Sequence, residues 1–221
     1  VPTGTCIEQA TYTDTILLPP NANGYDVSYA VCCRTYTSNN ITGRVGSTYH
    51  SQIPPNDTLC NSCAVFNNYP PTLLCINDPI NIDYSATDPD GDSLAYEFAT
   101  PFTGGSRFNT QPNASPPPFG TVNWAGGFNV NYQVTSSPAL SLDSYTGLLT
   151  GTPTGLGSFI TGVTVKEYRN GILINETRRD YLMFVVNCLP TSAAVTDPGV
   201  ICNSYTVNFG NSSMIPKCRF D

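Results

Sequence analysis

Residues 85–98 read Ser-Ala-Thr-Asp-Pro-Asp-Gly-Asp-Ser-Leu-Ala-Tyr-Glu-Phe, and this stretch decides the fold. Apolar and polar side chains alternate before it, over residues 80–86, and again over residues 94–98. Alternation with a period of two is typical of strands that bury one face. Asp-Pro and Asp-Gly favour turns, and Gly91 can adopt a positive φ without strain. The pattern predicts two strands that meet at a tight acidic turn.

The turn carries three carboxylates at alternate positions, Asp88, Asp90 and Asp92. Carboxylate oxygens are the ligands that Ca²⁺ prefers, and three of them on one short loop repel one another unless water or a cation screens the charge. We therefore hypothesise a Ca²⁺ site at these three residues and expect no other cofactor. The alternative is a solvated turn in which the Asp side chains accept hydrogen bonds from backbone amides.

Composition indicates an all-β protein. Only 11% of the 221 residues are charged, whereas Pro, Gly and Tyr are frequent, which is typical of β-rich extracellular modules. No window holds an apolar period of 3.6 residues, and strand and turn signals recur along the chain. We predict tandem immunoglobulin-like β-sandwiches, stapled by disulfides. The predicted division is a Cys-rich β domain (1–75), a sandwich (76–187) and a linker with the opening strands of a further repeat (188–221).

The charge pattern argues against two classes of partner. The net charge is −7 and the only basic pair is Arg178-Arg179, so no basic cluster is present that could hold a nucleic-acid backbone. No apolar run approaches the roughly 20 residues that a membrane-spanning helix needs. We expect neither nucleic-acid binding nor a membrane span.

Nine cysteines in an acidic chain indicate an oxidising, extracellular or cell-surface compartment. Neighbouring strand residues point to opposite faces, so Cys32 and Cys33 cannot both enter one core, and adjacent cysteines rarely bridge each other. We predict that Cys6 and Cys75 each pair with one of them. The odd count leaves at least one cysteine over, and Cys188 has no assigned partner.

Cys60-Asn61-Ser62-Cys63 forms a C-x-x-C motif. A redox role needs such a motif at a helix N-terminus in a βαβ context, which the surrounding sequence does not show. A zinc site needs further ligands, and His50 is the only histidine in the chain. We favour a small disulfide loop between Cys60 and Cys63.

Local patterns predict further strands. Asn170-Gly171 is the signal of a type I′ hairpin turn between strands at 158–168 and 172–186. The second of these strands carries the charged stripe 178–180, which suits an edge strand or a solvent face. Alternation also predicts strands at 10–18, 25–35 and 44–52 and continues over 120–134.

No residue is predicted to be catalytic, so the chain is interpreted as a protein that is not an enzyme. A Ser–His–Asp site would have to use His50, and no Gly-x-Ser-x-Gly turn occurs near it. A second function is considered for three aromatic residues, Trp124, Phe128 and Tyr132, which could form a glycan-binding platform.

Three regions resemble known repeat families. The acidic stretch 85–98 resembles the strand–turn–strand signature of cadherin-like and bacterial immunoglobulin-like repeats. Thr-Gly-Leu-Leu-Thr-Gly-Thr-Pro at residues 146–153 resembles the putative-Ig repeat of bacterial surface proteins. The C-terminal Thr-Val-Asn-Phe and Asn-Ser-Ser motifs resemble the opening of a polycystic-kidney-disease (PKD) repeat, which implies a bridge between Cys202 and Cys218. With Ser-Tyr-x-x-Cys-Cys-Arg at residues 28–34, the order resembles large repeat-bearing surface proteins of Bacteroidetes type.

This resemblance implies the function. Such proteins act in gliding motility or as adhesins, and they are exported by type IX secretion. The chain is then expected to be a non-enzymatic structural and adhesive module of a large cell-surface or filament protein. Its expected partners are neighbouring repeats of the same protein, further copies in a fibre, and surface glycans or the substratum.

Sites of glycosylation are also implied. Asp-Thr-Ile, Asp-Thr-Leu and Asp-Ser-Leu are similar to the O-glycosylation sequence of that bacterial group, which points to Thr15, Thr58 and Ser93. In a eukaryote the Asn-x-Ser/Thr sequences would be considered instead. These lie at Asn40, Asn56, Asn113, Asn175 and Asn211.

Overall fold

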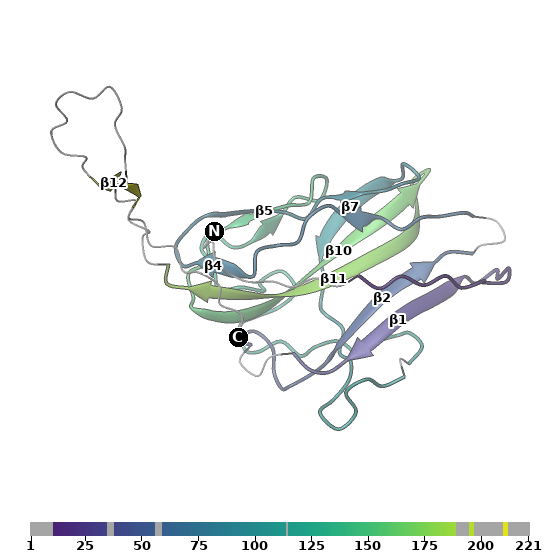
Figure 1. Ribbon diagram of the computed structural model, residues 1–221, viewed down its shortest axis with the longest axis horizontal. Coiled ribbons are helices and arrows are strands. Elements are labelled where there is room, and N and C mark those ends of the chain that lie inside the picture. Colours follow the sequence, from purple (N-terminus) through teal and green to yellow (C-terminus); the bar gives the residue numbers. More distant parts are fainter. Residues whose placement is uncertain are drawn as a thin grey trace.

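The computed structural model describes residues 11–34, 38–55, 59–113 and 115–188, and the backbone of two short paired strands, β12 (Val195–Thr196) and β13 (Gly210–Asn211). Within these residues the protein is all-β, as predicted, and contains no helix (Figure 1). It follows that the described part has no helix long and apolar enough to cross a membrane.

The main sheet has six strands, and its centre is the long hairpin that Asn170-Gly171 predicts. Both turn residues have positive φ, 54° and 77°, as a type I′ turn requires. The strand order is β1-β2-β11-β10-β7, and β4 pairs in parallel with the far end of β11. The strands are β1 (Tyr25–Val31), β2 (Ser47–Ile53), β4 (Leu73–Cys75), β7 (Ser93–Phe98), β10 (Gly157–Arg169) and β11 (Ile172–Val186).

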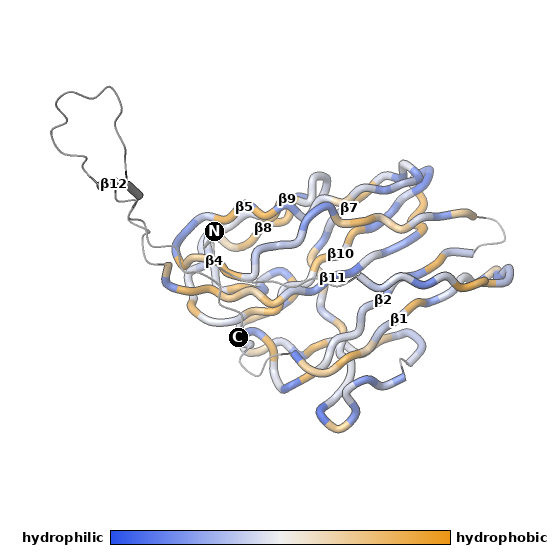
Figure 2. The backbone as a smooth tube through the Cα atoms, in the orientation of Figure 1, coloured by the Kyte–Doolittle hydropathy of each residue, from blue (hydrophilic) through white to orange (hydrophobic). Residues whose placement is uncertain are grey.

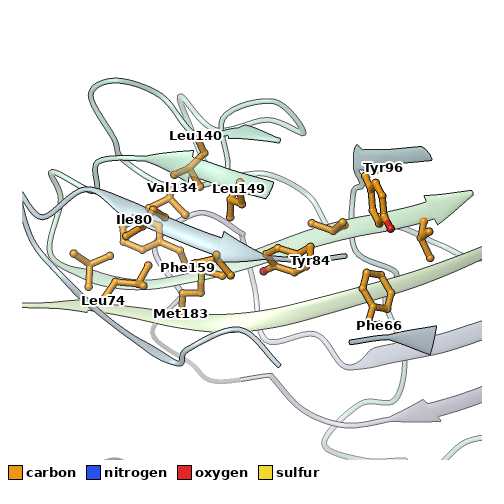
Figure 3. Packing of buried hydrophobic residues seen from close by; sticks show 14 of the residues in the cluster. Phe66, Leu74, Ile80, Tyr84, Tyr96, Val134, Leu140, Leu149, Phe159 and Met183 are labelled. Carbon is orange, nitrogen blue, oxygen red and sulfur yellow. The ribbon is translucent and has the colours of Figure 1, made fainter. Parts of the chain in front are cut away.

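A second layer covers one face of this sheet. It consists of the three-stranded sheet β5 (Ile80–Asp83), β9 (Leu148–Gly151) and β8 (Ser141–Leu142), with the pair β3 (Val65–Phe66) and β6 (Ala86–Thr87) beside it. Figure 3 shows Ile80, Tyr84 and Leu149 facing Phe159 and Met183 across the gap between the layers. The two layers therefore pack as a β-sandwich around one apolar core.

β10 is buried on both of its faces. Phe159 belongs to the main core, whereas its neighbour Ile160 packs with Ile41 and Val122 in a smaller cluster on the opposite face. A strand buried on both faces also has to bury its polar side chains, and Ser158, Thr161 and Thr164 of β10 are buried. Apolar segments accordingly alternate with paler ones along β10 in Figure 2.

Two buried side-chain amides close the edge of β10 where β7 ends. Asn40 Oδ1 accepts from Ile160 N at 2.9 Å, and Asn40 Nδ2 donates to Ile160 O at 2.7 Å. Gln133 repeats the arrangement at Gly162, with 2.7 Å to the nitrogen and 3.1 Å to the oxygen. Asn40 and Gln133 thus supply the bonds that a neighbouring strand would otherwise make.

The β1–β2 hairpin is attached to the rest of the main sheet by little strand pairing. β2 pairs with β11 through a single register position, Ser51 opposite Thr177, and Figure 1 shows the hairpin splaying away from the β10–β11 pair. Ala64, Phe66 and Leu74 nevertheless lie in the same core as β5 and β10. The predicted division at residue 75 therefore falls within a shared sheet and a shared core.

Three local predictions are wrong. Residues 11–18 of the predicted strand 10–18 lie in no strand and are almost entirely exposed. The alternating stretch 120–134 forms only isolated bridges, such as Trp124 with Ile41. β11 is not an edge strand but lies between β2 and β10, and its charged stripe is covered: Arg178 lies over the Phe102 ring and Arg179 over the Phe66 ring.

Candidate functional site

The acidic turn connects the two layers of the sandwich. β6, which precedes it, pairs with β3, and β7, which follows it, pairs with β10. Gly91 has a φ of 82°, as the sequence predicted. Asp88 Oδ1 accepts from the backbone amides of Asp90 and Asp92 at 2.9 and 3.0 Å, so one Asp side chain organises the turn.

Arg169, the last residue of β10, neutralises part of the charge. Its Nε and Nη2 donate to the two carboxylate oxygens of Asp92 at 2.7 and 2.6 Å, and Nη2 lies 3.5 Å from Asp90. The hydrogen bond from Arg169 holds the pKa of Asp92 below its usual range, and the same bond raises the pKa of Arg169. The repulsion between the carboxylates is therefore relieved in part by a guanidinium.

Glu167 brings a fourth carboxylate to this site and is completely buried. Its Oε1 accepts from Ala64 N at 2.7 Å and from Asn175 Nδ2 at 3.0 Å, and its Oε2 accepts from Asn61 Nδ2 at 2.9 Å. Three donors thus converge on one carboxyl group, so both of its oxygens have hydrogen-bond partners although the side chain is buried. The bonds also fasten the 59–66 loop to β10.

The candidate cation site differs from the predicted one by one residue. Oxygens of Asp88, Asp92 and Glu167 all lie within 4.8 Å of one another, whereas Asp90 turns toward the backbone amide of Ser62. Asp88 Oδ2 is buried and has no hydrogen-bond partner. Three carboxylates and one unused oxygen are ligands of the type that Ca²⁺ binds.

The contribution of β10 could not be read from sequence. Glu167 and Arg169 lie about eighty residues beyond the turn, and their only signal is that they are two of the three charges at the end of a strand whose other residues are uncharged. The antiparallel register of β10 with β7 places Tyr168 opposite Ser93. Its two neighbours, Glu167 and Arg169, are thereby brought beside the turn.

One disulfide encloses the sandwich. Cys75 is bonded to Cys188, which lies 113 positions further along the sequence, and 5.2 Å separate their Cα atoms. The parallel pairing of β4 with β11 sets Cys75 opposite Val186, two residues from Cys188. The prediction that Cys75 pairs with Cys32 or Cys33 is therefore wrong, and the unassigned Cys188 has its partner.

The other cysteines also differ from expectation. The sulfur atoms of the neighbouring residues Cys32 and Cys33 lie next to each other, so neither is near Cys75. Cys60 and Cys63 are free thiols. Arg169 donates to Cys60 O at 2.9 Å, and Cys63 Sγ lies 3.4 Å from Ser51 Oγ. Cys6, Cys202 and Cys218 lie outside the described residues.

A buried ion pair joins the β1–β2 hairpin to the sandwich. Arg34 bonds to Asp180 of β11 and to the carbonyl oxygens of Gly46 and Phe102. Burial raises the pKa of Asp180 above its usual value, although Arg34 acts in the opposite direction. The pair lines a pocket of about 340 Å³ together with Tyr49, Ile160 and Leu182.

The aromatic residues do not form one platform. Phe128 and Tyr132 are stacked with 5.9 Å between ring centres, and Phe128 also contacts Phe159 of the main core. Trp124 packs instead against the smaller cluster around Ile160. All three side chains are half-buried.

The proposed glycosylation positions fall in different environments. Thr15 and Ser93 are exposed, and Thr58 lies outside the described residues. Among the Asn-x-Ser/Thr sequences, Asn40 and Asn175 are buried, with 0% and 1% of their surface exposed. A folded chain therefore offers neither of these two side chains to an enzyme.

No family model matches the chain, and no curated protein or solved structure matches it either.

Proposed function

We propose that the chain is a non-enzymatic, extracellular module that bears load in a large cell-surface or filament protein, with an adhesive role. The observation that supports it is the Cys75–Cys188 disulfide, which closes a covalent loop around the sandwich. Tension on the two chain ends passes from residue 75 to residue 188 through one S–S bond. The strands between them then carry no force, because a covalent link bypasses them.

Other features fit this proposal. The described residues form β-layers with a continuous core, and the cysteine content suits an oxidising compartment. The tandem immunoglobulin-like arrangement and the PKD-like continuation belong to the same proposal, as do neighbouring repeats as partners. In this proposal the resemblance to Bacteroidetes-type surface proteins supplies the biological setting.

Force spectroscopy tests the load path. The chain is held at its two ends and extended with the disulfide intact, and again as the double variant Cys75→Ala, Cys188→Ala. An extended chain spans about 3.3–3.6 Å per residue, so the sequence separation of 113 between the two cysteines corresponds to roughly 370–410 Å. This length is expected only in the double variant. Equal extension of the two proteins would contradict the proposal.

Ca²⁺ binding is a further part of the proposal. Asp88, Asp92 and Glu167 would provide the ligands, and the buried, unpartnered Asp88 Oδ2 supports it. A bound ion would stabilise the sandwich by mass action. We expect Ca²⁺ to raise the Tm of the native protein and of Asp90→Asn but not of Asp88→Asn. If calorimetry shows no heat of binding and Ca²⁺ does not shift the Tm, the Ca²⁺ site is ruled out. The load-bearing role would not be affected by that result.

Glycan binding, the second candidate, finds less support. Trp124 and the stacked pair Phe128–Tyr132 pack on different clusters, so the three rings offer no single flat surface.

A further inference from the structure

The main sheet has two outer edges, and they differ in how they are covered. At the β7 edge, Tyr96 N donates to Ser144 O at 2.9 Å, so a loop occupies part of that side. At the β1 edge, no described residue bonds to the backbone of Tyr25–Val31 on the side away from β2. An open strand edge is a template for another strand.

β1 also lacks the features that keep edges from associating. It contains no Lys, Arg or Pro, and its single charge, Asp26, is paired with His50 at 2.6 Å. Val27 and Tyr29 are 50% and 55% exposed, and Tyr49 of β2 extends the same face. The edge is therefore apolar as well as unpaired, which favours strand addition.

The same chain holds a segment suited to this edge. Residues 11–18 read Thr-Tyr-Thr-Asp-Thr-Ile-Leu-Leu, in which β-branched and aromatic residues predominate. Within the described residues they make no bond to another strand, and Tyr12 and Leu17 are 93% and 97% exposed. The segment has eight residues and β1 has seven, so the two lengths match.

Residues 19–24 connect residues 11–18 to β1, and hydrogen bonds close them into a turn. The Tyr25 hydroxyl donates to Pro19 O at 2.6 Å, and Gly24 N donates to Asn21 O at 3.1 Å. With this turn closed, residues 11–18 do not pair with the β1 strand of their own chain. A second copy has the same open edge without that constraint.

We propose that residues 11–18 of one copy add as a strand to the β1 edge of a second copy. Main-chain hydrogen bonds would give the affinity, and Val27 and Tyr29 would contact alternate side chains of the added strand. Donor and acceptor lie on the same chain, so the contact can be repeated from copy to copy. The inference deepens the proposed function, since it names the partner of the module.

Sedimentation of the full chain over a range of concentrations tests this contact. The native protein is expected to associate as concentration rises. Thr13→Pro removes a donor amide from the added strand, and Val27→Lys places a charge on the edge. Each variant is expected to associate at least tenfold more weakly than the native protein. Thr13→Ala and the exposed β3 variant Val65→Lys are the matched controls and should associate normally.

Mixing the two variants gives the sharpest result. Thr13→Pro keeps its edge and Val27→Lys keeps its donor segment, so the mixture is expected to form a one-to-one pair that neither forms alone. A native protein that stays monomeric up to about 1 mM, the dissociation constant of a very weak complex, would overturn the proposal. So would a mixture that stays monomeric. Either result leaves the force experiment unaffected, so the two proposals fail separately.

Discussion

β10 and β1 belong to one sheet but differ in almost every physical respect. β10 lies inside the covalent loop and buries nine of its thirteen residues, whereas β1 lies outside it and buries only Ala30. β10 has strands or side-chain amides on both sides, whereas among the described residues β1 has a neighbouring strand on one side only. The comparison separates a buried body that a disulfide encloses from an exposed hairpin attached to its edge.

The largest expected difference in unfolding free energy is between two aromatic-to-alanine substitutions, one in each region. Phe159→Ala, inside the core, is expected to lower the free energy of unfolding by about 3–5 kcal/mol, because it removes apolar contacts and leaves a cavity. Tyr29→Ala, on the exposed edge, is the control and should change it by less than about 0.5 kcal/mol. Urea unfolding measures both. Equal losses would mean that the hairpin and the sandwich are not energetically distinct.

The joint between the two regions is the Arg34–Asp180 pair. Arg34→Met leaves a buried carboxylate without its partner and is expected to cost about 3–5 kcal/mol at pH 7. The pKa of Asp180 is already raised by burial and rises further without Arg34. A carboxyl with a raised folded pKa favours folding below its unfolded pKa, and this contribution is lost as pH rises through the folded value.

The loss of unfolding free energy in Arg34→Met should therefore become smaller as the pH is lowered from 7 toward 4. Urea unfolding of Arg34→Met and of the native chain at several pH values measures the difference. A loss that is the same at pH 7 and pH 4 would show that Asp180 does not carry it.

Removal of the Cys75–Cys188 disulfide is expected to have a moderate effect on the free energy of unfolding. Cys75→Ala with Cys188→Ala should lower the free energy of unfolding by about 2–4 kcal/mol, because the unfolded chain regains conformations that the bridge excluded. Cys60→Ala with Cys63→Ala, which removes two free thiols, is the control. If both pairs of substitutions cost the same, the bridge is not what stabilises the enclosed body.

The smallest effect is expected at the buried Glu167. Glu167→Gln turns one acceptor into a donor that faces another donor, at a cost of about 1–3 kcal/mol. Hydrogen exchange at Ala64 N, which donates to Glu167, should become faster. Glu176→Gln changes a surface carboxylate 3.9 Å from Lys166 and should leave stability within about 0.5 kcal/mol. Unchanged exchange at Ala64 in Glu167→Gln would contradict the role given to this bond.

The same comparison shows what sequence patterns can predict. Asn170-Gly171 and the long strands around it were predicted because turn chemistry and apolar runs are local signals. Alternation identified β1 correctly but not its exposure, since a period of two marks a face and not what covers it. Residues 11–18 have strand propensity without a strand, because pairing depends on a partner edge.

The site was predicted only in part for a similar reason. The turn with Asp88 and Asp92 was visible in the sequence, whereas Glu167 joins it through the register of β10 with β7. The Cys75–Cys188 bridge likewise depends on a parallel pairing of β4 with β11, and parallel pairing across about a hundred residues leaves no local pattern. Long-range contacts of this kind are fixed by the whole fold.

The buried amide of Asn40 has a practical consequence for how this protein is produced. Asn40-Ile41-Thr42 is an acceptor sequence for N-linked sugar, yet the fold needs the bare amide to bond with Ile160 and Gln133. A secretory eukaryotic host attaches such sugars during translation, before β10 has folded against the Asn40 side chain. Expression in a host without this machinery, or with Thr42→Ala, keeps the amide free for its place beside the sheet.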